Sequence, residues 1–172
     1  MGRIEEAKQI LINKSAPSIG IAALGVSTYD IDQVVKGYRE LYENQQFDDS
    51  LATEEVNVEK AIHGIVLWQI YQDHTEKDKV ESFISEIYPN LIAHQLFIYD
   101  HWCSADSGLI VENNELDPLI NSLFAGSNES LIELGYALGL SSHDLFEMNE
   151  LTLHSMNELL WSETAGLYHG YD

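Results

Sequence analysis

The sequence predicts an all-α fold of antiparallel helical hairpins, organised as one domain over residues 1–172. Apolar residues recur at intervals of three and four almost everywhere, whereas alternation at intervals of two is scarce, and this periodicity is typical of amphipathic helices. The 172 residues are enough to bury one core but few for two, and 45% of them are hydrophobic. We therefore expect a folded, single-domain, helical protein.

Four helices are expected in the first half of the chain, over about residues 4–13, 18–26, 31–42 and 57–71. Pro17 separates the first two, because proline removes a helical hydrogen-bond donor and clashes with the preceding turn. Asp30 and Asn57 are expected to cap the third and the fourth. Between Ile62 and Tyr71, apolar residues cover nearly the whole circumference of the fourth helix, which predicts the most buried helix of the chain.

In the second half, one helix is expected to start near Glu76 and another to follow Pro89, because proline suits the first turn of a helix. These two would form a hairpin. Asp117 followed by Pro118 is another start signal, for a helix that is bent or broken near Gly126 and ends around Leu138-Gly139.

The last predicted helix follows Ser141, which resembles a capping box with Asp144 three residues later. The residues of this helix that are expected to face inward are Leu145, Met148, Leu151, Met156, Leu159 and Leu160. The tail over residues 162–172 contains two glycines and two tyrosines, and it is expected to form a turn that leads into extended chain.

The chain is strongly acidic. It contains 8 Lys and Arg against 29 Asp and Glu, which gives a formal net charge of −21. Such a charge repels phosphate backbones and anionic lipid headgroups alike, so we expect no nucleic-acid partner and no membrane partner. The acidic residues form either an acidic docking face or an ordinary solvated surface, and the sequence leaves both interpretations open.

We expect no cofactor and no metal site. The one cysteine, Cys103, is expected to be a buried structural thiol and has no second cysteine for an intrachain disulfide. The seven histidines include no His-Glu-x-x-His spacing, and no glycine-rich phosphate loop or Gly-x-Ser-x-Gly turn is present. The start, Met1–Ala16, carries two glutamates among its apolar residues and no small-residue cleavage site, so we expect a cytoplasmic protein.

Several pairs of short stretches share patterns with one enzyme family, in the same order along the chain. They are Ala23-Leu24-Gly25 with Tyr29-Asp30, Ile62-His63-Gly64 with Trp68-Gln69-Ile70-Tyr71, Tyr88-Pro89-Asn90-Leu91 with Asp106-Ser107-Gly108-Leu109-Ile110, Leu116-Asp117-Pro118-Leu119 with Ser127-Asn128-Glu129-Ser130-Leu131, and Leu160-Trp161 with Ala165-Gly166-Leu167-Tyr168. The chain thereby resembles the catalytic domain of the mannosylglycerate hydrolase, trehalase and processing α-glucosidase group of glycoside hydrolases. The resemblance implies hairpins that form part of an (α/α) toroid.

The resemblance also indicates where a substrate pocket would lie. Glu59 and His63 stand at the positions of a Gln and a His of the family. Both are therefore expected at the inner end of their helix, facing a concavity. The alternative is that His63 is an ordinary helix residue with a satisfied hydrogen bond.

The catalytic carboxylates of the family have no counterpart here. Only residues 111–116 join Ile110 to Asp117, where the family carries the longer segment with its general acid. Glu112 and Glu115 are the candidates to replace that acid. Because glycosidic cleavage needs two carboxylates, we assign no catalytic residue.

These observations predict a glycoside-hydrolase-like helical domain that is catalytically incomplete and binds a carbohydrate without hydrolysing it. The alternative is a non-enzymatic module that binds a protein or a carbohydrate on the same scaffold, and a third reading is an unrelated helical protein. Trp68, Trp102 and Trp161 are expected in the core rather than stacked on sugar rings. An incomplete toroid would leave apolar helix flanks uncovered, so a homo-oligomer is expected as well.

Overall fold

The computed structural model describes residues 20–28, 30–44, 56, 58–112 and 115–170. Its α-helices are α2 (Gly20–Ser27), α3 (Ile31–Asn44), α4 (Val58–Ala61), α5 (His63–Asp73), α6 (Lys77–Trp102), α7 (Pro118–Leu138) and α8 (His143–Ser155). A π-helical turn over Met156–Leu160 follows α8, and two short antiparallel strands, β1 (Trp161–Ser162) and β2 (Leu167–Tyr168), follow that turn. The described chain is mostly helical, as predicted. The predicted helix over residues 4–13 and the Asn57 cap lie outside the described residues.

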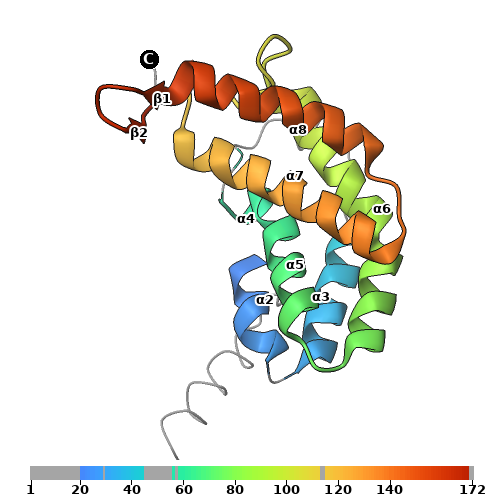
Figure 1. Cartoon of the computed structure of the whole chain (residues 1–172). Helices are drawn as coiled ribbons and strands as arrows, with labels where there is room; N and C mark the ends of the chain where they lie inside the picture. The colour runs from blue at the N-terminus through green and yellow to red at the C-terminus, as the bar shows by residue number, and fades with distance from the viewer. Residues whose placement is uncertain (1–19, 29, 45–55, 57, 113–114, 171–172) are drawn as a thin grey trace, which may run out of the picture.

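The helices form two groups that share α6 (Figure 1). In the first group, α2, α3, α5 and the beginning of α6 run alongside one another. In the second group, α7 and α8 lie side by side and antiparallel across the other end of α5 and α6. Because α6 is 26 residues long, it extends from the first group to the second.

One hydrophobic core runs between the two groups. Its largest fully buried side chains include Tyr38, Leu67, Ile84, Leu91, Phe124, Leu131, Leu134 and Leu145. The expectation that α5 is the most buried helix is not met, since 5 of its 11 residues are buried against 10 of 21 in α7. The difference arises because Trp68 and Tyr71 are only partly buried and stack on each other, with ring centroids 5.7 Å apart.

Helices α5 and α7 approach each other closely at Gly64. A Cβ atom at this position would lie 2.2 Å from the carbonyl oxygen of Ser127 and 2.9 Å from the Leu131 side chain. The Gly64 N–H donates to Ser127 Oγ at 2.9 Å. Only glycine leaves room for this contact, which positions the two helix groups relative to each other.

Local start and stop signals in the sequence are confirmed at three helix ends. Asp117 Oδ1 accepts a hydrogen bond from the Leu119 N–H at 2.7 Å at the start of α7. Asp30 Oδ1 accepts one from the Gln33 N–H at 3.3 Å at the start of α3. Gly139 ends α7 in the left-handed region with φ 67°. These signals act over a few residues, so tertiary packing has little influence on them.

The predicted hairpin around Pro89 is wrong. Residues 77–102 form one continuous helix, α6, with Pro89 in its interior. Proline cannot donate to the carbonyl of Ser85 four residues earlier, but both residues are exposed, so water can bond that carbonyl. The flanking apolar residues Ile84, Ile87, Tyr88 and Leu91 are buried in the core and hold the helix together across the proline.

Three smaller predictions also need correction. The helix expected over residues 57–71 is divided into α4 and α5 at Ile62, and α7 runs without a break through Gly126. The residue before α8 is Ser142, which makes no side-chain capping bond, so the box predicted from Ser141 does not form. Leu159 was expected to face inward but is 45% exposed. The π-helical turn has more residues per turn than an α-helix, so the side chains after α8 point in other directions than the α-helical pattern predicts.

The chain after the π-helical turn forms the predicted turn followed by extended chain, and the extended part pairs back with Trp161–Ser162 as a hairpin. Trp161 pairs with Tyr168 across the two strands, and their rings meet edge to face with centroids 5.1 Å apart. Gly166, with φ 65°, closes the turn, and its N–H donates to the Ser162 carbonyl at 2.7 Å. The positive φ explains why glycine occupies this place.

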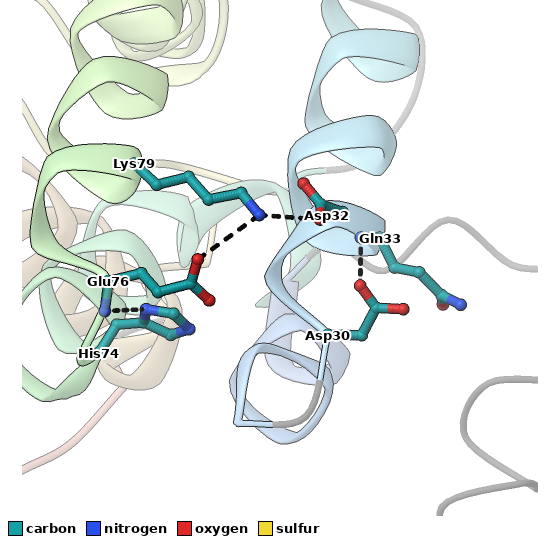
Figure 2. Close-up of polar contacts among 6 residues, drawn as sticks. All are labelled: Asp30, Asp32, Gln33, His74, Glu76 and Lys79. Carbon is teal, nitrogen blue, oxygen red and sulfur yellow. Dashed lines mark hydrogen bonds and ion pairs between the residues drawn. The ribbon is translucent and has the colours of Figure 1, made fainter.

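Ion pairs join α3 to α6 at the surface. Lys79 Nζ lies 2.8 Å from an Asp32 carboxylate oxygen and 3.8 Å from one of Glu76 (Figure 2). About two turns further along each helix, the Arg39 guanidinium donates to both carboxylate oxygens of Glu86 and lowers the pKa of that carboxyl group. All of these groups are solvated, so each pair adds little to stability and mainly orients the two helices.

Helices α6 and α7, with 26 and 21 residues, are long enough to be considered as membrane spans. Within the described part of the chain, no helix has the length and the apolar content that crossing a membrane requires.

Candidate functional site

Two surface hollows stand out among the described residues. The first, of about 320 Å³, lies between α2 and α5 and is lined by residues that include Leu24, Ser27, Ile70 and Asp73. Its polar groups already bond within the chain. Ser27 Oγ donates to the Leu24 carbonyl at 3.0 Å, and Asp73 accepts from the Gln69 amide at 2.6 Å. This hollow therefore offers a ligand few groups that are not already engaged.

The second hollow, of about 420 Å³, lies where α7 ends and α8 begins, and we refer to it as the α7–α8 hollow. Its lining residues are Ile132, Gly135, Tyr136, Gly139, Leu140, Ser142, His143 and Phe146. Two of them are large and strongly exposed: 82% of the surface of Tyr136 and 52% of that of Phe146 are accessible to solvent. Aromatic residues so exposed at the edge of a concave site are typical of binding surfaces.

A helix C-terminal motif shapes one side of the α7–α8 hollow. The Leu140 N–H donates to the Gly135 carbonyl at 2.8 Å, and the Gly139 N–H donates to the Tyr136 carbonyl at 3.4 Å. These are the two bonds of the Schellman motif, in which the left-handed residue turns the chain sharply away from the helix axis. The turn is short, so α8 returns beside the last turns of α7 and the hollow forms between them.

Gly135 lines the hollow, and the Tyr88 hydroxyl of α6 packs closely against Gly135. A Cβ atom on Gly135 would lie 2.5 Å from the Tyr88 hydroxyl, so glycine is needed for the α6 tyrosine to reach α7. The Tyr88 hydroxyl donates to the Leu131 carbonyl at 2.8 Å and also bonds the Ser142 side chain. Burial raises the pKa of Tyr88, which keeps this hydroxyl neutral. Tyr88 therefore links α6 to α7 and to the residue before α8 beside the hollow.

The α7–α8 hollow has few polar side chains. The polar side chains among its lining residues are those of Tyr136, Ser142 and His143. His143 lies on the exposed surface, 3.7 Å from a carboxylate oxygen of Glu147. The hollow has no pair of carboxylates among its lining residues and no nucleophile held beside a base, which general acid–base and covalent mechanisms both need.

His63, a predicted pocket residue, lies in the interior at the first position of α5. It is 4% exposed and borders neither of the two hollows. Its Nδ1 lies 3.2 Å from the Tyr38 hydroxyl, and its ring meets that of His94 edge to face at 5.4 Å. Burial, with a contribution from His94, lowers the pKa of His63 to about 3. This environment matches the alternative of a bonded interior histidine.

The other predicted pocket residues lie apart from this cluster. Glu59 belongs to α4, and its side chain is outside the described residues. Glu112 Oε1 accepts a hydrogen bond from the Val56 N–H at 2.8 Å, so this carboxylate ties two segments of the chain together. Glu115 is exposed and pairs with Glu112 through the backbone. The structure thus brings together Glu112 and Glu115 but does not bring His63 to them.

A buried polar group that the sequence did not reveal joins α5, α6 and α7. Ser127 Oγ accepts from the Gly64 N–H at 2.9 Å and from the Gln95 amide at 3.1 Å. Gln95 Oε1 has no hydrogen-bond partner among the described residues. The contact with Ser127, which is 32 residues away in the sequence, accounts for the burial of the Gln95 amide.

Cys103 was predicted to be a buried structural thiol, and it is only partly buried, at the end of α6. Burial, with a contribution from Asp100, raises the pKa of its thiol to about 12. The thiolate is the reactive form, so this cysteine is a poor nucleophile at neutral pH. Among the described residues, no group of three or more His, Cys, Asp and Glu is arranged to hold a metal ion.

Comparison with known proteins identifies no relative of the chain. No family model, no curated protein and no solved structure matches it. The resemblance to the glycoside hydrolases therefore rests on the short sequence patterns alone.

Proposed function

We propose that this chain is a non-enzymatic interaction module that binds a protein partner at the α7–α8 hollow. The observation that supports this most directly is the exposure of Tyr136 and Phe146, at 82% and 52%, on either side of a hollow of about 420 Å³. Aromatic side chains contribute much of the binding energy of protein interfaces, because they bury a large area with few rotatable bonds. An exposed apolar site on a chain this acidic is therefore a candidate interface.

The carbohydrate-binding reading is the second candidate, and it uses the same site. A sugar ring could stack on Tyr136, but sugar recognition also needs several hydrogen bonds to hydroxyl groups. Apart from Tyr136 itself, the lining offers the side chains of Ser142 and His143, and Ser142 already bonds Tyr88. The apolar character of the remaining lining favours a protein side chain over a sugar.

The glycoside-hydrolase reading remains a proposal of lower rank. It predicts that consecutive hairpins follow part of an (α/α) toroid, with a pocket near Glu59 and His63. The continuous helix α6 replaces one of the expected hairpins, and the Glu112 carboxylate is bonded to the Val56 N–H. We infer that a domain of this kind would not turn over glycosides, because the general acid alone contributes about a hundredfold to ten-thousandfold in rate.

A parallel screen separates the three readings. Wild type, Tyr136→Ser and Phe146→Ser would be applied to a peptide array and a glycan array, with Ile21→Ser as the matched control, since Ile21 is 53% exposed on α2. Peptides that lose binding in the two hollow variants but not in the control support the proposed function. Glycans with the same pattern support the carbohydrate reading. If no ligand depends on Tyr136 or Phe146, the proposed function fails.

The enzymatic reading is tested by release of aryl leaving groups, glucose or mannose from an α-glycoside panel, with Glu112→Gln and Glu115→Gln run beside the wild type. We expect no turnover above that of a buffer control. Turnover that disappears in either variant would overturn the non-enzymatic proposal and identify the replacement acid.

A further inference from the structure

Charge is distributed very unevenly along the chain. None of the 8 Lys and Arg residues lies after Lys79, whereas 15 of the 29 Asp and Glu residues do. Helices α7 and α8 and the C-terminal hairpin therefore carry carboxylates with no lysine or arginine to offset them. A surface that only kept the protein in solution would not need its positive and negative charges to be separated along the chain.

The lysines and arginines of the described residues are also engaged by the chain itself. Lys36 pairs with Glu40, Arg39 with Glu86 and Lys79 with Asp32, Lys77 bonds the carbonyls of Tyr71 and Gln72, and Lys60 lies over the Trp102 ring. They lie on α3, α4 and α6. The α7–α8 surface thus keeps its negative potential, because these cations are on other helices.

Exposed carboxylates flank the α7–α8 hollow. Glu133 stands three residues before Tyr136 on α7, and Glu150 stands four residues after Phe146 on α8. Glu147 stands four residues after His143 and lies 3.7 Å from it. Residues three and four apart share a face of a helix, so Glu133 and Glu150 lie on the helix faces of Tyr136 and Phe146, and Glu147 lies on that of the lining residue His143. We call Glu133, Glu147 and Glu150 the acidic rim.

The hollow and its rim together define the chemistry of a complementary ligand. The apolar lining favours an apolar side chain, and the rim favours cations placed within a few ångströms of that side chain. An anionic ligand would be repelled, and a neutral one would leave the charges of the rim unused. A peptide segment in which Lys or Arg alternates with bulky apolar residues along one face meets both requirements.

We propose that the partner segment bound at the α7–α8 hollow is a basic, amphipathic stretch of another protein, with an apolar side chain in the hollow and Lys or Arg on the acidic rim. This inference rests on the proposed function and adds the chemical class of the partner. Charge complementarity of this kind speeds association and rejects acidic competitors.

The test uses the full chain and three fluorescein-labelled 14-residue peptides with one amphipathic pattern: Leu with Lys, Leu with Glu, and Ser with Lys. Binding is followed by fluorescence anisotropy in 50 mM and 300 mM NaCl. We expect the Leu–Lys peptide to bind at least tenfold more tightly than the other two. Its affinity should fall at the higher salt concentration, because the ionic interactions are then screened.

Variants separate this inference from the proposed function. A rim variant, Glu133→Gln/Glu147→Gln/Glu150→Gln, should weaken the Leu–Lys peptide at least tenfold. A charge-matched control, Asp100→Asn/Asp106→Asn/Glu163→Gln, changes exposed carboxylates away from the hollow and should leave the affinity within about twofold of wild type. Tyr136→Ser/Phe146→Ser should weaken binding as strongly as the rim variant.

Three outcomes would overturn the inference. The first is that the Leu–Lys peptide fails to bind. The second is that the charge-matched control variant loses as much affinity for this peptide as the rim variant does. The third is that the Leu–Glu peptide binds as tightly as the Leu–Lys peptide. Peptides that depend on Tyr136 and Phe146 but not on the rim would leave the proposed function standing and remove only the basic partner. Loss of all dependence on the two aromatic residues would remove both.

Discussion

The Tyr38 hydroxyl of α3 and the Nδ1 atom of His63 in α5 lie 3.2 Å apart in the interior of the molecule. On its other side, His63 meets the ring of His94, whose Nε2 lies 3.0 Å from the Lys60 carbonyl. Helices α3, α4, α5 and α6 are thus linked in the buried interior by two polar contacts and one contact between rings. Such a network is stable only while both histidines are neutral.

We therefore expect stability to fall with decreasing pH. Burial lowers the pKa of His63 to about 3 and lowers that of His94 as well, whereas both titrate near about 6.5 in the unfolded chain. In this window the unfolded chain binds protons that the folded protein does not, so the free energy of unfolding decreases as pH falls from about 6.5 towards about 3. His63 should contribute a slope of about 1.4 kcal/mol per pH unit in this window, and the lowered pKa of His94 adds to the slope in the same direction.

The measurement is urea unfolding between pH 7.5 and 4.5 for wild type and His63→Gln/His94→Gln. Titration of the carboxylates affects both proteins, so the difference between the two slopes isolates the histidines. The exposed His143→Gln serves as the control and should keep the wild-type slope. Equal slopes in wild type and the double variant would show that the buried pair does not govern the pH dependence.

A second prediction concerns the two glycines at the contact of α5 and α7. Gly64→Ala should lower the free energy of unfolding by about 2 kcal/mol or more, because its Cβ would lie 2.2 Å from the Ser127 carbonyl oxygen. Gly126→Ala is the matched control, since its nearest neighbour, Ile65 Cδ1, is 3.4 Å away and the position is helical. That change should stabilise by up to about 1 kcal/mol through helix propensity. A neutral Gly64→Ala variant would mean that the two helices pack less closely than described.

A third prediction concerns the proline inside α6. Pro89→Ala should raise the free energy of unfolding by about 1–2 kcal/mol, because alanine restores the hydrogen bond to the Ser85 carbonyl and has a higher helix propensity. The gain is reduced because alanine is more flexible in the unfolded chain. Pro118→Ala offers the comparison, since Pro118 is the first residue of α7, where the N–H has no helical partner. Thermal unfolding should show a higher Tm for Pro89→Ala only.

A fourth prediction concerns self-association. Leu159, Trp161, Leu167 and Tyr168 are all more than a third exposed around the C-terminal hairpin. We expect a weak dimer through this surface at high protein concentration and in 0.5 M salt, where repulsion between chains of net charge −21 is screened. Sedimentation should show it in wild type and in Ile21→Ser, but not in Trp161→Ser/Leu167→Ser. A wild-type monomer under those conditions contradicts the prediction.

Several features of the fold were determined by the sequence alone, because they depend on neighbouring residues. The 3.6-residue periodicity set the helical class. The Asp30 and Asp117 side chains bond backbone groups two or three residues away, and the left-handed Gly139 ends α7 without help from any distant residue. Such interactions are the same in nearly every tertiary context, which is why these helix ends could be predicted.

The tertiary structure decided the rest. Pro89 is a good first residue for a helix and also a tolerable interior residue, and only the burial of Ile84, Ile87 and Leu91 against other helices selects the continuous α6. The candidate site was equally hidden, because Tyr136 follows Ile132 at helical spacing and reads as a core residue. Its exposure depends on where α8 lies after the turn at Gly139, and that position is set by packing across the whole molecule.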